Sequence, residues 1–476
     1  MAALNESTEA THQGPAPSPT STRGAYFALL VLFSMNMLNY VDRYVFYVVG
    51  EKVSQDLHFS DFRFGILSSS FMVVYTLVAP MMGHLGDRGN RTRLLAFGVG
   101  LWSLATVGTA FAGRVFGWSF HEMFFWRALL GVGEATYGVV APTLLADLFS
   151  PRARGRVIGL FYLALPVGGA LGYGLGGWVS HFAGWRAAFL VVGLPGLIAA
   201  GSALWIRDPG RGASEGQGLA HDEGQSGLSA LRDWLNPSFV LNTLGLTAVT
   251  FATGAYAVWG ASFYQRVHGM EVHHAGKSIG VLTLTAGLVG IGLGMWLPDL
   301  LRKLTPRAYL SWAGLCCSLS VPFALLGLLS RDTNTSLGLI FVAMVLLAAV
   351  LGPCNTVTAN VVPARHRAAG FALSIFFLHA FGDILSPPLI GRLSEFFGDP
   401  ARSDLAINRF LAEIGHGPIL AATGVSTNLT VGMLSVVPML SLGGILFLIG
   451  SRFLKQDQER AHLASLGVEC EGLPLH

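Results

Sequence analysis

The sequence predicts an all-α membrane protein with about twelve transmembrane helices in two six-helix halves, and three observations lead to this fold class. Hydrophobic residues make up 52% of the 476 residues and charged residues only 12%, which is about half the charged share of a typical soluble protein. The 60 glycines suit membrane helices, because small residues let helix backbones approach closely. The third observation is an internal repeat that relates the two halves of the chain.

Apolar stretches long enough to cross a bilayer, about 20 residues each, recur along the whole chain. We expect the first six spans near 26–50, 63–84, 92–113, 121–146, 156–180 and 186–206. We expect the other six near 238–265, 277–300, 308–329, 337–361, 370–397 and 428–453.

A stretch rich in Gly, Asp, Glu and Ser interrupts this pattern and predicts a cytoplasmic linker between the two sets of spans. The amino-terminal segment is polar and rich in Pro, Ser and Thr, a composition typical of disorder. The predicted units are a disordered cytoplasmic arm (1–24), an N-terminal half (25–206), the linker (207–236), a C-terminal half (237–455) and a cytoplasmic tail (456–476).

The basic residues predict which ends of the spans face the cytoplasm. With the amino terminus inside, the short cytoplasmic loops carry Arg88, Arg91, Arg93, Arg152, Arg154, Arg156, Arg302, Lys303, Arg307, Arg365 and Arg367. The opposite loops carry only scattered cations. Because cytoplasmic loops are enriched in Lys and Arg, we expect both termini in the cytoplasm.

The internal repeat supports two parallel halves. Three pairs of residues share one offset of 212 positions: Asp87 with Asp299, Arg91 with Lys303, and Pro151 with Pro363. Each pair lies at the end of an even-numbered span or in the loop that follows it. Halves repeated in this way place a substrate path between them in membrane carriers.

Two motifs of the N-terminal half resemble a known family. The loop after the second span reads Gly83-His-Leu-Gly86-Asp87-Arg88-Gly89-Asn90-Arg91 and is similar to the signature loop of the major facilitator superfamily, with Asn90 where Gly is usual. The fourth span carries Arg127-Ala-Leu-Leu-Gly131-Val-Gly133-Glu134, close to the R-x-x-x-G-x-G motif of that superfamily. Together with NYVDRY at 39–44 and ADLFSPRARG at 146–155, they make the chain resemble the spinster-like branch.

The resemblance implies a proton-coupled carrier that works by alternating access, without a cofactor. Animal members of this branch carry amphiphiles such as lysophospholipids or sphingosine-1-phosphate. The expected partners are therefore protons, the lipid bilayer and a small amphiphilic substrate, and the expected form is a monomer in a bacterial inner membrane. A carrier of organic anions or drugs, a membrane-embedded lipid enzyme and a channel remain the alternatives. Pro166-Val-Gly168-Gly169 matches the exporter signature only in part, which leaves the direction of transport open.

Ionisable residues within the spans are candidates for function, because charge in hydrocarbon is costly. In the N-terminal half, four of them lie inside the first and fourth spans and away from the span ends: Asp42, Arg43, Arg127 and Glu134. The repeat offset places apolar or small residues at the equivalent positions, namely Gly254, Ala255, Leu339 and Leu346. An ion cluster that served only the fold would recur in both halves, although a structural ion-pair lock remains the alternative.

Helix geometry predicts that these charges meet. Asp42 lies about 24 Å along the first span at 1.5 Å per residue, a depth similar to that of Arg127 on the antiparallel fourth span. Arg127 and Glu134 share one helix face. Burial disfavours an ionised carboxylate and nearby arginines favour it, a balance suited to proton coupling. We therefore assign Asp42 and Glu134 to proton coupling, and Arg43 and Arg127 to charge pairing and substrate binding.

The remaining candidates are gating and cavity residues. Alternating access needs contacts that form in one state and break in the other, and the motif loops predict such contacts at Gly83, Gly86, Asp87, Arg88, Arg91, Asp147 and Arg154. His379 and Asp383 stand four residues apart on one helix face and predict a polar cavity wall or gate, with helix-to-helix hydrogen bonding as the alternative.

The motifs of other protein classes do not fit their contexts. Residues 172–177 read G-x-G-x-G-G but lie within an apolar span, whereas a dinucleotide site needs that turn between a strand and a helix. The sequence contains no P-loop, no G-x-S-x-G and no basic-aromatic surface for nucleic acid. The Cys and His spacings predict no metal site, and no catalytic residues are expected.

Overall fold

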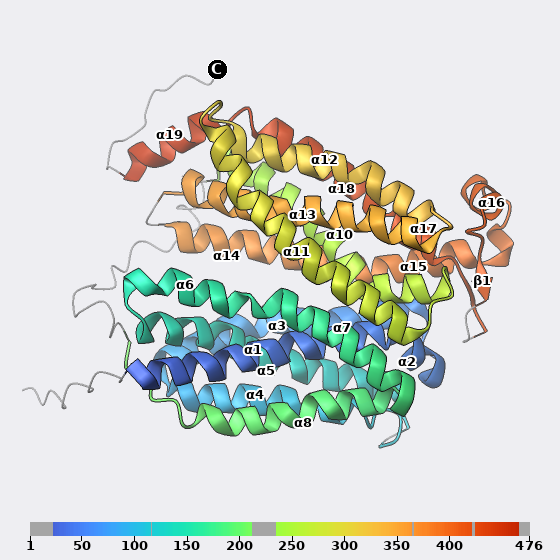
Figure 1. Ribbon diagram of the computed structural model, residues 1–476, viewed down its shortest axis with the longest axis horizontal. Helices are drawn as coiled ribbons and strands as arrows, with labels where there is room; N and C mark the ends of the chain where they lie inside the picture. The colour runs from blue at the N-terminus through green and yellow to red at the C-terminus, as the bar shows by residue number, and fades with distance from the viewer. Residues whose placement is uncertain (1–21, 116, 212–234, 364–365, 421–423, 466–476) are drawn as a thin grey trace, which may run out of the picture.

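The computed structural model describes residues 22–115, 117–211, 235–363, 366–420 and 424–465. The arm at 1–21, most of the linker (212–234) and the end of the tail (466–476) lie outside these ranges. The chain forms two helical bundles that lie side by side, the N-terminal half in blue to green and the C-terminal half in light green (α10) to red (Figure 1).

All regular secondary structure among the described residues of the N-terminal half is helical. Its helices are α1 (Thr22–Val48), α2 (Gly50–Leu57), α3 (Asp61–Arg88), α4 (Arg91–Thr109), α5 (Ser119–Leu148), α6 (Pro151–Tyr162), α7 (Ala164–Ala183) and α8 (Trp185–Ala203). Side-chain caps fix two of the helix starts: Ser60 accepts the Arg63 N–H before α3, and Asn90 accepts the Arg93 N–H before α4. Such caps satisfy backbone donors that have no partner inside the helix.

The C-terminal half repeats the bundle and adds a small insertion. Its long helices are α10 (Pro237–Arg266), α11 (Val272–Arg302), α12 (Ala308–Leu329) and α13 (Thr333–Val361). The fifth span comprises α14 (Arg367–Phe377), the π-helix η2 (Leu378–Asp383) and α15 (Ser386–Gly398). The insertion and last span comprise the 3₁₀ turn η3 (Pro400–Arg402), α16 (Ala406–Glu413), β1 (Ile419–Leu420), β2 (Ser426–Thr427), α17 (Leu429–Leu434), α18 (Val436–Gly450) and the tail helix α19 (Leu454–Ser465). Strands β1 and β2 form an antiparallel pair in which Ile419 faces Thr427.

Twelve helical segments fit the predicted spans. Eleven of them, among the described residues, are long and apolar enough to cross a membrane. The twelfth is α4, whose first turn carries Arg91 and Arg93 and is therefore less apolar. It packs between α5 and α8 within the N-terminal bundle, which is the place of the third span.

Three predicted spans are interrupted in the structure, and a proline follows each interruption. The fifth span bends at Leu163, before Pro166; the eleventh contains the π-helix η2, before Pro387 and Pro388; the twelfth breaks at Ser435, before Pro438. Proline has no N–H to donate to the carbonyl four residues earlier. Each of these helices therefore changes its hydrogen-bond pattern within the turn that precedes the proline.

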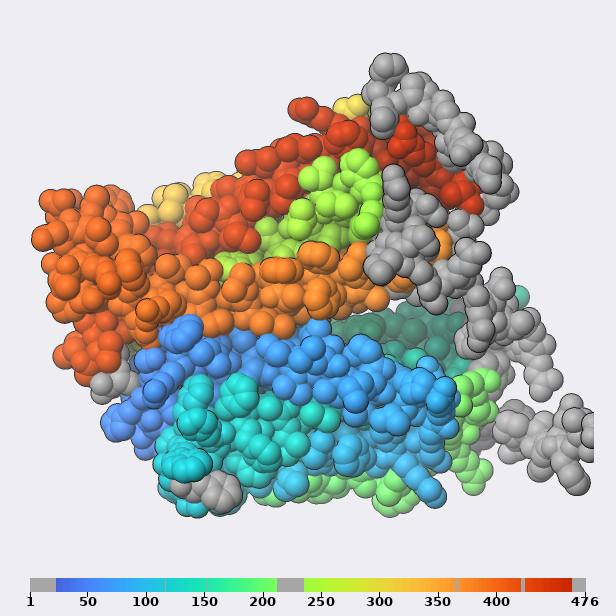
Figure 2. Space-filling view, turned by 180° about the vertical axis from the view of Figure 1, so that it is seen from behind, coloured from blue at the N-terminus to red at the C-terminus, as the bar shows by residue number. Residues whose placement is uncertain are grey.

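The two ends of the molecule differ in how closely the halves meet. We call the end that carries the helix termini near 88–91, 148–151, 203–211 and 302–308 the linker side, and the end that carries α2, α16, β1 and β2 the hairpin side. At the hairpin side α15 lies directly against α3, so that a Cβ on Gly391 would collide with the Asp61 carbonyl oxygen. Figure 2 shows the halves in contact on the hairpin side and diverging toward the linker side.

Candidate functional site

A cavity of about 410 Å³ lies between the two halves near the middle of the spans. Its N-terminal wall includes Tyr40, Arg43 and Tyr44 of α1, and its C-terminal wall includes His379 and Asp383 of η2. Apolar side chains of α10, α11 and α13 make up much of the remaining lining. The cavity therefore combines a largely apolar volume with polar groups on two opposite walls.

Arg43 and Glu134 form an ion pair on the N-terminal wall. Glu134 Oε2 lies 2.6 Å from Arg43 Nη2 and accepts a hydrogen bond from Nε at 2.8 Å. The Glu134 side chain is 1% exposed and that of Arg43 is 17% exposed. Oε1 of Glu134 has no hydrogen-bond partner among the described residues. The carboxylate is thus held by one arginine that itself reaches the cavity.

Arg127 is buried next to this pair but packs on aromatic rings. Its guanidinium carbon lies 4.1 Å from the ring centre of Phe46 and 4.8 Å from that of Phe71. Nε and Nη2 of Arg127 have no hydrogen-bond partner among the described residues. A cation over an aromatic face is stabilised electrostatically, so Arg127 is held without a direct carboxylate contact.

Asp42 faces away from the cavity toward α4. It accepts a hydrogen bond from the Thr106 hydroxyl, while its Oδ1 has no partner among the described residues. It nonetheless lies within electrostatic reach of Arg127, Glu134 and Arg43. The structure thus brings the four predicted charges into one cluster and makes Arg43–Glu134 its direct ion pair.

His379 and Asp383 lie on the cavity wall of the C-terminal half. His379 Nδ1 and Asp383 Oδ2 are 2.9 Å apart, and the Tyr75 ring approaches His379 from the other half. Gly254, the repeat counterpart of Asp42, lies against this pair, because a Cβ there would be 3.0 Å from Asp383 Oδ1. The acidic and imidazole groups on this wall therefore come from the eleventh span.

The predicted gating residues gather at the linker side of the N-terminal half. Arg91 contacts Asp147 at 2.5 Å and also pairs with Asp208, a residue that the sequence left in the linker. Burial opposes ionisation of Asp208, but hydrogen bonds from Arg91 and from the Gly210 N–H outweigh it and hold the pKa of this carboxyl below its usual value. Arg91 therefore ties the ends of α4, α5 and α8 together.

The other members of the predicted loop are placed around this pair. Gly83 and Gly86 let α3 lie close to Val139 and Val140 of α5. Asp87 and Arg88 are exposed at the end of α3, and Arg154 is half-buried on α6. Arg211 donates to the carbonyl oxygen of Gly86 at 2.6 Å.

Sequence reasoning missed an ion cluster that joins the two halves on the hairpin side. Arg266, at the end of α10, contacts Glu51 of α2 at 2.5 Å and Asp61 of α3 at 2.8 Å. Ser394 of α15 also donates to Asp61 at 2.7 Å. The side chains of Arg266 and Asp61 are 8% and 3% exposed. Glu51, Asp61 and Arg266 each lie one or two positions outside a predicted span, where charged residues are ordinary and do not point to a function. Only the fold shows that these three residues meet.

A row of aromatic rings connects the charge cluster to this closed side. Phe46, which packs on Arg127, stacks on Phe64 with ring centres 5.2 Å apart. Phe64 meets the edge of Trp259 of the other half at 5.3 Å. The Trp259 indole N–H donates to the Pro387 carbonyl at 3.1 Å. Side chains in contact therefore connect Arg127 without a gap to the interface between the halves.

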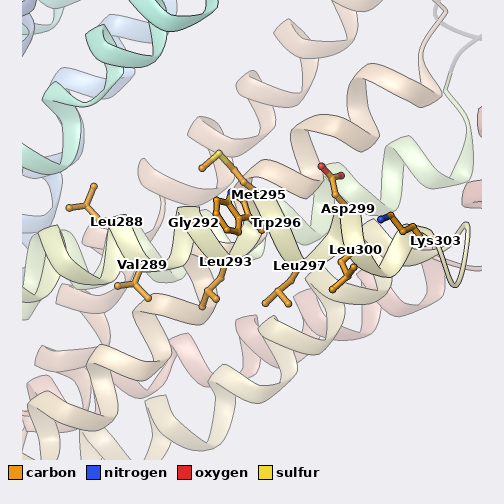
Figure 3. A pocket seen from close by; sticks show the side chains of 10 residues that line it. All are labelled: Leu288, Val289, Gly292, Leu293, Met295, Trp296, Leu297, Asp299, Leu300 and Lys303. Atoms are coloured by element: carbon orange, nitrogen blue, oxygen red, sulfur yellow. The ribbon is translucent and has the colours of Figure 1, made fainter.

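A second and larger concavity, of about 870 Å³, lies along α11 and is not the central cavity (Figure 3). Residues of this one helix line it, among them Leu288, Trp296 and Leu300. It lies opposite the face on which Gly290 and Gly294 pack against α13. An apolar, exposed groove on a single helix fits a surface in contact with lipid chains.

Known proteins resemble this chain over most of its length. The family model of the Major Facilitator Superfamily matches residues 32–387. "Protein spinster homolog 1" of Xenopus tropicalis is 32% identical over 464 residues, which cover 94% of this chain and 84% of that protein. "Protein spinster" of Drosophila melanogaster is 34% identical over 431 residues, which cover 87% and 70%. The chain belongs to the spinster family of the major facilitator superfamily.

A solved structure agrees with this spinster-family assignment. A bacterial homologue of the human lysosomal transporter Spinster, in an inward-facing and unoccupied conformation, matches with a TM-score of 0.78 and 25% identity over 92% of this chain and 99% of that chain. The family and the twelve-helix transporter fold expected from the motifs are thus confirmed. In this spinster-family transporter the central cavity lies between halves that are closed on the hairpin side.

Proposed function

We propose that this protein is a proton-coupled carrier of an amphiphilic, lipid-like solute with an anionic headgroup. The observation that carries the proposal is the Arg43–Glu134 pair on the wall of a cavity shared by both halves. The pair offers a cation for a headgroup and a carboxylate for a proton at the same place. Lysophospholipids and sphingosine-1-phosphate-like molecules have the required chemistry.

The lining of the cavity supports an apolar chain on the substrate. Apolar side chains such as Leu282, Ala286 and Leu347 occupy the wall away from Arg43. Burying apolar surface stabilises a bound chain by about 25 cal/mol per Å². A compact organic anion or drug, the competing substrate class, would reach the arginine but leave this wall uncovered.

Proton coupling is assigned to Glu134 and Asp42. Protonation of Glu134 removes the charge that neutralises Arg43, so the guanidinium becomes available to a headgroup. Arg127 supplies a second cation next to it, stacked on Phe46. Asp42 serves as the second proton site and exchanges its proton beside Thr106. Each step changes a buried charge by one unit, which is costly enough to shift a two-state equilibrium of a few kcal/mol.

Alternating access is assigned to rocking of the two halves. The Arg266 cluster closes the hairpin side, and the linker side carries the basic loops. Cations concentrate in cytoplasmic loops, so we assign the linker side to the cytoplasm. We assign the protein itself to the bacterial cell membrane. The Arg91 cluster then holds the cytoplasmic ends of the N-terminal helices as one rigid unit.

The decisive experiment is transport by the purified protein in proteoliposomes under an imposed pH gradient. Lysophospholipids and sphingosine-1-phosphate would be compared with sugars, organic acids and a cationic drug. We expect saturable accumulation of an anionic amphiphile that collapses when a protonophore removes the gradient. Accumulation of organic acids, with no response to amphiphiles, would instead favour the competing class.

A further inference from the structure

Three metal-ligating side chains meet on the hairpin side, outside the central cavity and the Arg266 cluster. His181 lies in the last turn of α7, Glu271 immediately precedes α11, and His273 lies in its first turn. One ligand atom from each lies within 4.8 Å of the other two. His181 is 90 positions from Glu271 and 92 from His273, so sequence spacing does not reveal this cluster.

The distances within the cluster suit a tetrahedral metal ion. Glu271 Oε2 is 3.3 Å from His273 Nδ1 and 3.6 Å from His181 Nδ1. Zinc ligands at about 2.0–2.1 Å in a tetrahedron lie roughly 3.3–3.4 Å from one another. His273 Nδ1 is buried and has no hydrogen-bond partner among the described residues. Its lone pair is therefore available to a cation.

The helices that carry the ligands belong to different halves and pack very closely. A Cβ at Gly177 of α7 would lie 2.8 Å from the Val272 carbonyl oxygen of α11. This contact fixes the position of His181 relative to His273. Opening the hairpin side would move α7 away from α11, and one ion could not then bind both histidines.

We propose that His181, Glu271 and His273 form a binding site for a divalent transition-metal ion, zinc above all, and that the ion holds the hairpin side closed. Two imidazoles and a carboxylate are ligands that zinc favours. Three protein ligands leave a fourth position for water. Since the ligands are together only in the closed arrangement, the ion stabilises that arrangement by mass action.

The positive charge of Lys52, next to Glu271, provides a further way to test the metal site. The Lys52 ammonium donates to the Ser180 carbonyl at 2.7 Å and interacts electrostatically with Glu271. A fixed positive charge next to the carboxylate opposes the binding of a dication. Replacing Lys52 with Gln should therefore tighten zinc binding.

The binding experiment uses the full-length purified protein and Zn²⁺ alone, measured by calorimetry. We expect one ion per chain, affinity at least about tenfold lower in His181→Gln/His273→Gln, and unchanged affinity in His121→Gln, an exposed histidine on the same side. Lys52→Gln should raise the affinity. Equal affinity in wild type and the double variant would overturn the site.

The conformational experiment does not depend on which solute is carried, although the closing effect rests on the proposed rocking of the halves. Spin labels at Val115→Cys and Ala412→Cys, both exposed on the hairpin side of different halves, would report the distance between the halves in a background free of native cysteines. Zn²⁺ should enrich the short-distance population, and the double variant should abolish this response. Specific binding with an unmoved distance distribution would retain the metal site and overturn the closing role.

Discussion

The two halves share one bundle design, but they differ in what fills their centres. The N-terminal half holds a buried cluster of Asp42, Arg43, Arg127 and Glu134. At the repeat positions the C-terminal half has Gly254, Ala255, Leu339 and Leu346. Its polar wall comes instead from the His379–Asp383 pair. In the proposed mechanism the response to protons is therefore concentrated in one half, and the other half serves mainly as an apolar wall.

In the proposed mechanism a change in one half must reach the other, and packed side chains provide the route. Among the described residues, the four charges of the central cluster form no ion pair with the other half. The ring row from Phe46 through Phe64 to Trp259 does cross the interface between the halves. Coupling carried by packed side chains needs an element with two discrete arrangements, and the interface between α3 and α15 is such an element in the proposed mechanism.

The largest effect should follow from breaking the ion pair of the charged half. Glu134→Gln leaves Arg43 buried without a carboxylate partner, a loss that costs about 3–5 kcal/mol in known buried pairs. Gradient-driven accumulation should fall at least about tenfold, since each 1.36 kcal/mol is a factor of ten. The measurement is solute uptake and proton flux in proteoliposomes at matched protein content.

Asp383→Asn in the other half is the matched control. It preserves the shape of the His379–Asp383 contact, and the comparison predicts a smaller loss of gradient-driven accumulation. An effect of Asp383→Asn as large as that of Glu134→Gln would show that both halves sense protons. The division of roles between the halves would then be wrong.

The second effect concerns the closed side. Arg266→Ala leaves Glu51 and Asp61 without their shared cation in a largely buried site, which destabilises the closed arrangement by about 3–5 kcal/mol. We expect the population to shift toward a state open on the hairpin side and transport to decrease. Reactivity of a cysteine that replaces Ser69, a 5% exposed residue of α3 one turn from Gly65, would report the opening. Arg409→Ala, an exposed arginine of α16, should leave that reactivity unchanged.

A moderate effect is expected at the linker side. Arg91→Ala removes the cation that Asp147 and Asp208 share, and it should lower the transport rate several-fold. Substrate affinity should change little, because none of these three residues lines the central cavity. Lys303, the repeat counterpart of Arg91, is exposed. Lys303→Ala should therefore have the smaller effect on uptake rates, and equal losses in the two variants would contradict the asymmetry.

The sequence predicted the spans and the charged half well, because both depend on local signals. Length and hydropathy locate each span, and the 212-residue offset pairs the halves. The depth of Asp42 and Arg127 predicted one cluster, as found. Depth alone could not predict that Arg43 of α1 would pair with Glu134, because Arg127 lies on the same helix as Glu134 and only the packing of α1 against α5 decides which arginine reaches the carboxylate.

The remaining features depend on contacts between distant segments. Arg266 meets Asp61 across 205 positions, and His181 meets His273 across the interface between halves. No periodicity relates such residues. The interruption at Leu163 did have a signal, Pro166, but proline is tolerated in membrane helices, so its presence alone does not predict a break.

The smallest expected effect is on thermal stability, and it concerns a histidine of the C-terminal half that lies outside the spans. His416 follows α16, is 3% exposed, and has Nε2 3.0 Å from the Leu329 carbonyl oxygen. Burial lowers the pKa of His416; its hydrogen bond to Leu329 opposes this shift and the charge of Arg331 adds to it. His268 nearby also has a lowered pKa, chiefly from burial. A histidine whose pKa is lowered by folding resists protonation in the native state, so its contribution to stability is complete above the unfolded pKa of about 6.5.

That contribution decreases as the pH falls from about 6.5 toward the lower native pKa. Wild-type protein should therefore lose melting temperature, on the order of 1–2 °C, between pH 7.5 and 5.5. His416→Gln keeps an N–H for Leu329 but cannot titrate, so its melting temperature should depend less on pH over the same range. Thermal unfolding of both proteins in one detergent measures the difference. Parallel pH profiles for the two proteins would mean that His416 is not the group responsible for the loss.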